Sequence, residues 1–87
     1  MNIGTELRIK VATYALGLQK LEIIGNGFTD GAKVIINGKM IKKKPAFKFG
    51  DTLVLTGSLK KLKLKEGENQ IVVKIDSLHS APARLLF

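Results

Sequence analysis

Hydrophobic and polar residues alternate with a period of two along most of the chain, and no long stretch shows the period of an amphipathic helix. In the first such segment Leu7, Ile9 and Val11 alternate with charged residues. The apolar series then continues on even-numbered positions at Tyr14, Leu16 and Leu18. A shift of one residue turns side chains to the opposite face of a strand. We therefore expect a bulge or kink near Ala12 and Thr13, where a first strand crosses between two sheets.

The chain is organised around residues 21–40, LEIIGNGFTDGAKVIINGKM, which predict two strands joined by a glycine-rich turn. Leu21, Ile23 and Gly25 share one face of the first strand, and Phe28 is expected to plug the core after it. The glycines stand where a strand end or a turn needs a permissive φ, so backbone geometry explains them without a ligand.

The second of these strands leads into Asn-Gly at residues 37–38, the preferred pair of a two-residue type I′ hairpin. With that register, Val34 faces Ile41 on the core side of the hairpin. Ile35 then faces Met40 on the outer side.

The later segments carry the same alternation, interrupted by turn signals. Three consecutive lysines and Pro45 argue against a central strand, so an edge strand or a loop is expected there. The remaining elements are an alternating segment 47–49, a strand 52–56, an extended or crossover segment 58–65, a turn 66–69, the strongest central strand 71–75, a turn 76–80 and a final strand 81–87.

The length of 87 residues suits one domain, so residues 1–87 are assigned to a single all-β domain with one core. Short strands with a turn signal every ten residues or so indicate an antiparallel sandwich or barrel. Truncation to Ala is expected to cost most stability at Ile23, Val34, Leu55 and Val73.

The apolar and glycine pattern of residues 21–28, followed by DGAKV at 30–34 and Asn-Gly at 37–38, resembles the IPT/TIG family of bacterial type. GENQIVV at 67–73 and SAP at 80–82 are similar to the family's last hairpin, although the family's Pro-rich opening is missing. The resemblance implies an immunoglobulin-like antiparallel β-sandwich of about seven strands, in a protein that is extracellular or on the cell surface. It does not imply one activity, since members occur in receptors, bacterial secreted proteins, carbohydrate-active enzymes and transcription factors.

Composition excludes several classes of site. The chain has no cysteine, which excludes a disulfide framework and a thiolate metal site. Its apolar runs are far shorter than the roughly 20 residues of a transmembrane helix, and its first residues lack the order of a signal peptide. We therefore expect no membrane insertion.

Catalytic chemistry is not predicted. The one histidine, His79, is expected in a solvated turn, where no third group would orient it as a base. The carboxylates are scattered, and the one close pair, Glu66 and Glu68, falls in a predicted turn. We expect the chain to be neither an enzyme nor the holder of a metal or cofactor.

Positive charge provides the first candidate site. Fifteen Lys and Arg against seven Asp and Glu give a net charge of +8, which attracts nucleic acid, anionic polysaccharide or acidic lipid. The same lysines could instead serve solubility and protect sheet edges. They are densest at residues 39–48 and 60–65, which would form a polyanion-binding surface if the fold brings the two stretches together. The candidate residues are Lys42, Lys43, Lys44, Lys48, Lys61, Lys63 and Lys65.

An apolar outer face provides the second candidate site. The residues expected to point into the core are Val34, Ile36, Ile71, Val73, Leu85 and Phe87. Those left on the outer face are Ile35, Met40, Val72 and Leu86. In an immunoglobulin-like topology the outer four belong to neighbouring strands of one sheet, and contiguous apolar patches mark docking surfaces. Val and Ile also favour strands wherever they point, which explains them without a partner.

The sequence thus predicts a non-catalytic structural or protein-interaction module, monomeric or weakly dimeric, that acts as a spacer or docking domain beside adjacent domains or another protein. A polyanion-binding module using the lysine stretches is one alternative. A designed scaffold without natural function is another, since short loops and the Asn-Gly hairpin are features that designers choose. An accessory domain of a carbohydrate-active enzyme would need an exposed aromatic platform, for which Tyr14 is the only polar aromatic residue.

Overall fold

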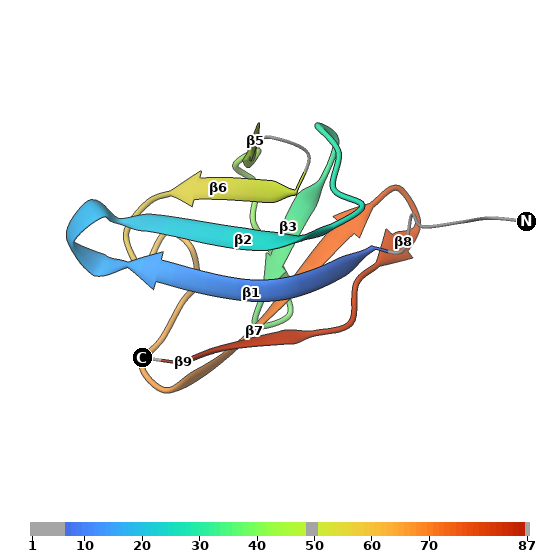
Figure 1. Cartoon of the computed structure of the whole chain (residues 1–87). Helices are drawn as coiled ribbons and strands as arrows, with labels where there is room; N and C mark the ends of the chain where they lie inside the picture. The colour runs from blue at the N-terminus through green and yellow to red at the C-terminus, as the bar shows by residue number, and fades with distance from the viewer. Residues whose placement is uncertain (1–6, 49–50, 87) are drawn as a thin grey trace, which may run out of the picture.

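A computed structural model describes residues 7–48 and 51–86, which form nine β-strands and one 3-10 turn in two antiparallel sheets packed face to face (Figure 1). The first sheet has the order β1 (Arg8–Ala15), β2 (Lys20–Asn26), β6 (Thr52–Thr56) and β5 (Ala46–Lys48). The second has the order β4 (Lys39–Met40), β3 (Lys33–Ile36) and β7 (Glu68–Ile75), with β8 (Leu78–His79) and β9 (Ala83–Leu86) both paired to β7.

These two orders correspond to the ABED and C′CFG sheets of immunoglobulin domains. The prediction of an all-β, immunoglobulin-like antiparallel sandwich is therefore confirmed. Two of the nine strands, β4 and β8, have only two residues each, which accounts for the excess over the expected seven.

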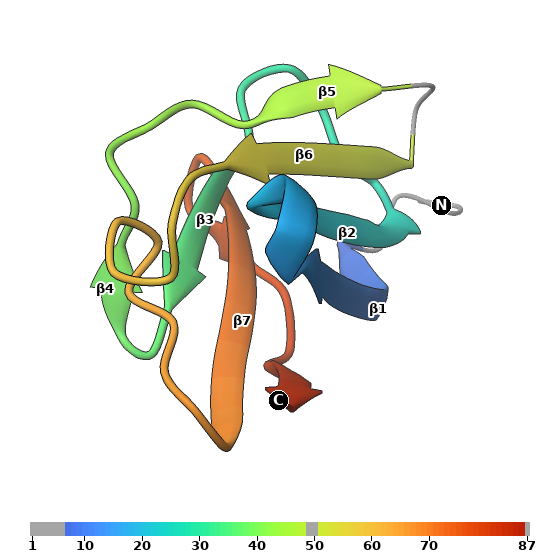
Figure 2. The same cartoon turned by 90° about the vertical axis from the view of Figure 1, so that its left-hand side faces the viewer.

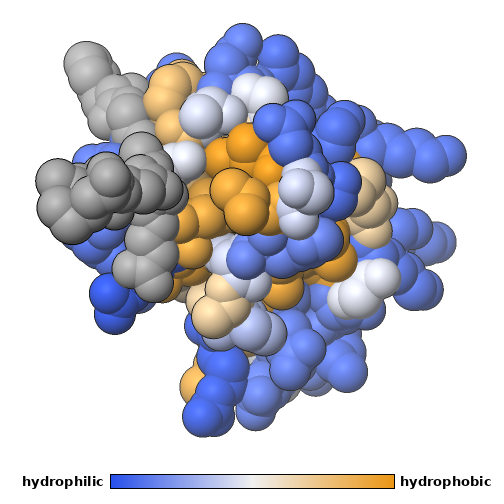
Figure 3. Space-filling view, turned by 90° about the vertical axis from the view of Figure 1, so that its right-hand side faces the viewer, coloured by the Kyte–Doolittle hydropathy of each residue, from blue (hydrophilic) through white to orange (hydrophobic). Residues whose placement is uncertain are grey.

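The core lies between the sheets and consists mainly of aliphatic residues paired across neighbouring strands. The four pairs are Leu21–Leu55, Ile23–Leu53, Val34–Val73 and Ile36–Ile71, and none of these side chains is more than 1% exposed. Phe28 is also buried, as predicted, in the segment that joins β2 to β3. Viewed from the end that carries this segment and the β7–β8 turn, apolar side chains show between charged ones (Figure 3).

The first strand changes face earlier than predicted. Its pairing with β2 shifts register between Ile9 and Val11, before the expected site at Ala12 and Thr13. Val11 is therefore 45% exposed and does not share the inner face of Ile9, whereas Ala12 is buried. Beside this shift, the Arg8 carbonyl comes so close to Gly25 of β2 that a Cβ at residue 25 would clash. The described part of β1 pairs with β2 alone, so the predicted crossing between sheets is not seen in it.

The apolar alternation also fails after Tyr14. Leu16–Leu18 form the 3-10 turn η1 at the end of the β1–β2 hairpin, closed by Gln19, which has a φ of 50° and donates its N–H to the Leu16 carbonyl. Leu16 and Leu18 are therefore not core residues but are 64% and 71% exposed.

The β3–β4 hairpin has the predicted turn and register. Asn37 and Gly38 have φ values of 53° and 81°, as a type I′ turn requires. Ile35 lies opposite Met40, and the N–H of the buried Ile41 donates to the backbone of β3. Residues 42–45 then form a loop, which is one of the two structures expected for them.

Residues 57–67 cross from β6 in the first sheet to β7 in the second, which is one of the two alternatives predicted for this segment. The predicted turn 66–69 is wrong at its end, because Glu68 and Asn69 already belong to β7 and Asn69 is fully buried. The predicted turn 76–80 contains β8, in which His79 pairs with Lys74. Phe49 and Phe87, both assigned from alternation, lie outside the described residues.

Candidate anion-binding groove

A groove of about 620 Å³ opens at the end of the sandwich where the β1–β2 hairpin turns. Its walls are residues 18–19, 40–43, 56–57 and 61–63, which come from the hairpin, β4 and the loop after it, the end of β6, and the crossover. Figure 2 looks onto this end, with the hairpin turn, β4 and the crossover grouped around it. We call it the lysine groove, because Lys42, Lys43, Lys61 and Lys63 are among its walls.

The crossover forms one wall through a short helical turn. The Leu62 N–H donates to the Ser58 carbonyl at 3.0 Å, and the Leu64 N–H donates to the carbonyl of residue 59 at 2.9 Å. Leu62 is buried and anchors this turn, so Lys61 and Lys63 on either side of it are left exposed. The alternation in the sequence therefore corresponds to one buried residue, Leu62, between two exposed lysines.

The loop after β4 forms the facing wall. Ile41 is buried and fixes the start of the loop, after which Lys42 and Lys43 are exposed. The Lys43 ammonium reaches across to the end of β6, where it donates to the carbonyl and to the Oγ1 of Thr56, both at 2.8 Å. Lys43 thus ties two walls of the lysine groove together.

The hairpin is fastened to the same place. The Gly57 N–H donates to the Gln19 carbonyl at 2.8 Å, and the Tyr14 hydroxyl donates to the Gly57 carbonyl at 2.7 Å. Tyr14 is therefore half-buried and engaged in the fold, which argues against its use as an exposed carbohydrate platform. Together with the Lys43 contacts, these bonds make the lysine groove a preformed feature.

Hydrogen bonds of Asn37 and Asn69 hold the end of the crossover in place. The Asn69 Oδ1 accepts from the backbone N–H of Lys65 and from the Asn37 Nδ2, both at 2.9 Å. The same Asn37 Nδ2 donates to the Lys63 carbonyl at 2.9 Å. The sequence-based predictions include neither the role of Asn37 nor that of Asn69 in this network. The signal for Asn69 was its odd-numbered position, which it shares with the inward-pointing Ile71 and Val73.

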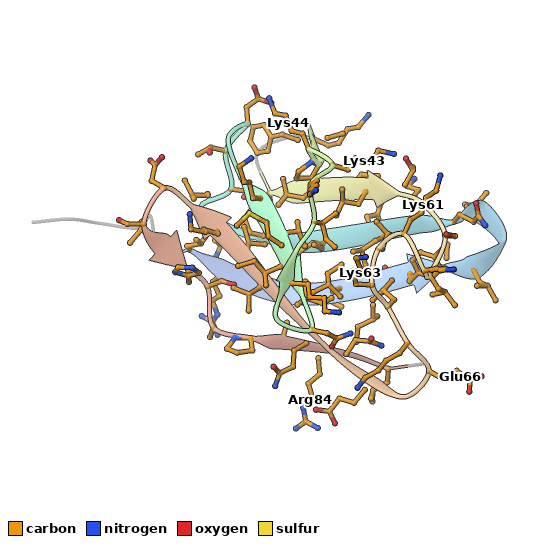
Figure 4. All side chains as sticks on the ribbon, turned by 180° about the vertical axis from the view of Figure 1, so that it is seen from behind. Lys43, Lys44, Lys61, Lys63, Glu66 and Arg84 are labelled. Atoms are coloured by element: carbon orange, nitrogen blue, oxygen red, sulfur yellow. The ribbon has the colours of Figure 1, made fainter. Side chains whose placement is uncertain are left out.

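Among the described residues, the walls of the lysine groove carry no counter-charge. No Asp or Glu within 7–48 and 51–86 lines it, and the two ion pairs found in those ranges, Lys44–Asp30 and Arg84–Glu68, both lie outside it. Four ammonium groups on a concave surface produce a positive field that concentrates anions. Figure 4 shows Lys43, Lys61 and Lys63 on the face seen from behind, with Glu66 and Arg84 farther down that face.

The other lysines of the two stretches lie elsewhere. Lys44 pairs with Asp30 at 3.4 Å, and Lys48 ends β5 at the edge of the first sheet. Lys65 lines a smaller depression together with Glu68 and two amide side chains. The fold thus brings together four of the seven lysines proposed from sequence.

The second predicted surface is partly assembled. Met40 lies opposite Ile35, and Ile35 lies opposite Val72, so the three form a continuous row across β4, β3 and β7 on the outer face. Leu86 belongs to the same sheet but lies opposite Glu68, at the far end of β7 from the row. We call the three residues the apolar row. Met40 is also a wall of the lysine groove, so the two surfaces adjoin.

His79 lies exposed on β8, away from the lysine groove. In the part of the chain that the structure describes, no three His, Asp or Glu side chains gather as metal ligands would. Within residues 7–48 and 51–86, no helix has both the length and the apolar character needed to cross a bilayer.

Comparisons of this chain with protein-family models, with curated proteins and with solved structures find no match.

Proposed function

We propose that this chain is a non-catalytic binding module that holds an anionic ligand in the lysine groove. The observation that carries the proposal is the meeting of two lysine stretches, separate in sequence, around one concavity that no carboxylate of the described residues lines. Lysines that serve only solubility need not gather around one groove. They also need not lie on walls that are hydrogen-bonded to one another, as these walls are.

The open shape of the lysine groove suits an extended polyanion. A groove open to solvent lets a chain of sulfates or phosphates pass along the lysines, and Lys side chains act as point charges that tolerate varied anion geometry. Arg, which would read a phosphate bidentately, is absent from the walls. The module would therefore recognise charge density more than a particular chemical sequence.

The test compares two variants that carry the same net charge. The groove variant is Lys42→Gln/Lys61→Gln/Lys63→Gln, and the control variant is Lys10→Gln/Lys33→Gln/Lys74→Gln, whose lysines lie outside the lysine groove. Lys43 is left in place because it holds the groove walls together. Heparin is the probe, and its affinity is measured by titration calorimetry at low ionic strength.

The groove variant is expected to lose on the order of tenfold or more in heparin affinity, whereas the control variant should lose much less. Equal losses in the two variants would mean that only net charge matters, and the proposed site would be wrong. Absence of heparin binding by the unaltered protein at low salt would end the proposal outright.

Protein docking through the apolar row is a second candidate function, and the register that aligns Met40, Ile35 and Val72 favours it. It agrees with a spacer or docking role in a larger surface or secreted protein of the IPT/TIG kind. The glycine pattern of residues 21–28 and the strand order of the two sheets support that family. Sedimentation equilibrium tests the self-docking form, which predicts a dimer weakened by Met40→Lys. A strict monomer at high concentration would exclude self-association.

A further inference from the structure

The end of the molecule that carries the lysine groove also carries its two most exposed turn leucines. Leu18 is 71% exposed and Leu16 is 64% exposed, in the 3-10 turn that closes the β1–β2 hairpin. Apart from its two chain neighbours, Gly17 between them has no heavy atom within 4 Å of where a side chain would begin, so the turn projects from the body of the protein. Two large apolar side chains are thus exposed to water within one turn, where burial against a partner would stabilise them.

The turn is held firmly in this projecting position. β1 and β2 pair continuously from Ala12–Ile23 to Ala15–Lys20, immediately before the turn. Gln19, which ends the turn, also accepts a hydrogen bond from Gly57 at the groove wall. Because the hairpin is already ordered, burial of the leucines against a partner would cost little conformational entropy.

Apolar and cationic groups therefore occur together at this end. Leu18 is itself a wall of the lysine groove, beside the four lysines. A soluble polyanion would engage the lysines and leave the leucines in water. A surface that presents anionic groups above an apolar layer would engage both, because the exposed leucines and the lysines lie at the same end of the molecule.

We infer that the anionic ligand of the lysine groove is the headgroup layer of an anionic lipid bilayer, into which Leu16 and Leu18 insert as a shallow anchor. This inference rests on the proposed anion binding and adds the leucines to it. Peripheral proteins bind such membranes through buried apolar area combined with attraction between basic residues and acidic lipid. The chain would lie on the membrane without crossing it.

The first arm of the test measures co-sedimentation with vesicles of phosphatidylcholine alone and of phosphatidylcholine mixed with phosphatidylserine. The unaltered protein is expected to bind the mixed vesicles and not the neutral ones. The Leu16→Ser/Leu18→Ser variant should lose on the order of tenfold in partitioning into mixed vesicles. Leu16→Ser alone, at a residue that is not a wall of the lysine groove, should weaken this partitioning while keeping the heparin affinity. Leu78→Ser, at an exposed position on β8, is the control and should bind as the unaltered protein does.

The second arm reports insertion directly. The chain has no tryptophan, so Leu18→Trp supplies a single indole whose emission should shift to the blue with mixed vesicles. Leu78→Trp is at an exposed position on β8, which lies at the opposite end of the molecule from the β1–β2 hairpin turn (Figure 1), and it should show no shift. Thermal melts of all variants confirm that they fold.

The outcomes separate the two proposals. Heparin binding without binding to mixed vesicles would overturn the lipid inference and leave the anion-binding proposal intact, with a soluble polyanion as ligand. Equal binding to neutral vesicles, an emission shift at residue 78 as large as at residue 18, or unchanged binding after loss of both leucines would each overturn the inference. Failure to bind either heparin or vesicles would remove both proposals.

Discussion

Asn69 is the residue whose replacement tests the structural account most sharply, since it is a fully buried polar side chain in a sandwich of aliphatic residues. Its Oδ1 accepts from Lys65 and Asn37, both at 2.9 Å. Its Nδ2 donates to the Lys65 carbonyl at 2.8 Å and to the Leu85 carbonyl at 3.3 Å. These contacts connect the end of the crossover, the β3–β4 turn and β9 to one point.

The variant Asn69→Leu keeps the approximate volume and removes these four bonds, together with the longer one from Nδ2 to the Gly67 carbonyl at 3.4 Å. At about 1 kcal/mol net for each hydrogen bond, the loss is about 4 kcal/mol, of which the buried Leu returns roughly 1 to 2 kcal/mol. The net loss of about 2 to 3 kcal/mol is a large part of the roughly 4 to 13 kcal/mol expected for a domain of this length. The melting temperature should fall by roughly 10 to 20 °C.

Urea unfolding followed by circular dichroism measures this loss, with Gln70→Leu as the matched control at the adjacent, exposed position. The control should change the free energy of unfolding by no more than about 0.5 kcal/mol. If Asn69→Leu shifts the midpoint no more than Gln70→Leu does, the reasoning that this network holds the crossover is refuted.

Other replacements test the core and the glycine corner. The core positions to be truncated to Ala are Ile23, Val34, Leu55 and Val73. In thermal melts, each truncation should lower the free energy of unfolding, by about 2 to 5 kcal/mol for Ile and Leu and by less for Val. Val11→Ala, on the surface, is the control and should be nearly neutral. A core variant that melts with the unaltered protein would contradict the packing. Gly25→Ala should lose roughly 1 to 3 kcal/mol or more, because the new Cβ would meet the Arg8 carbonyl and, at 2.7 Å, the Phe28 ring. Gly17→Ala, with open space around it, should be neutral or slightly stabilising, so equal melting temperatures of these two glycine variants would show that the close approach is not real.

The strands were predictable where one face is buried and the other is exposed, and the register was predictable where a two-residue turn fixes it. The β3–β4 hairpin follows from Asn37-Gly38 and the alternation before it, and its observed register is the predicted one. The bulge in β1 was misplaced because its position is set by the pairing with β2, where the Arg8 carbonyl lies close against Gly25. Alternation within one strand carries no information on such a contact between strands.

The site was predictable in composition but not in assembly. The two lysine stretches were evident from charge density, yet the choice of Lys42, Lys43, Lys61 and Lys63 depends on the path of the crossover. The exposure of Leu18 was missed because the period-two pattern of the sequence continues through residues 16–18. In the structure these residues form a 3-10 turn, so the pattern no longer tells which side chains face the core. Turn geometry at the hairpin end therefore has to be known before the apolar tip can be recognised.

Salt dependence of binding to a DNA duplex, used as a polyanion of known charge spacing, tests the central claim most directly. If Lys42, Lys61 and Lys63 each displace one counterion, the slope of log affinity against log salt should become shallower by about 2 to 3 in the groove variant. The charge-matched control variant should keep nearly the slope of the unaltered protein. Identical slopes for the groove and control variants would contradict the account, because binding would then depend on the net charge and not on the lysine groove.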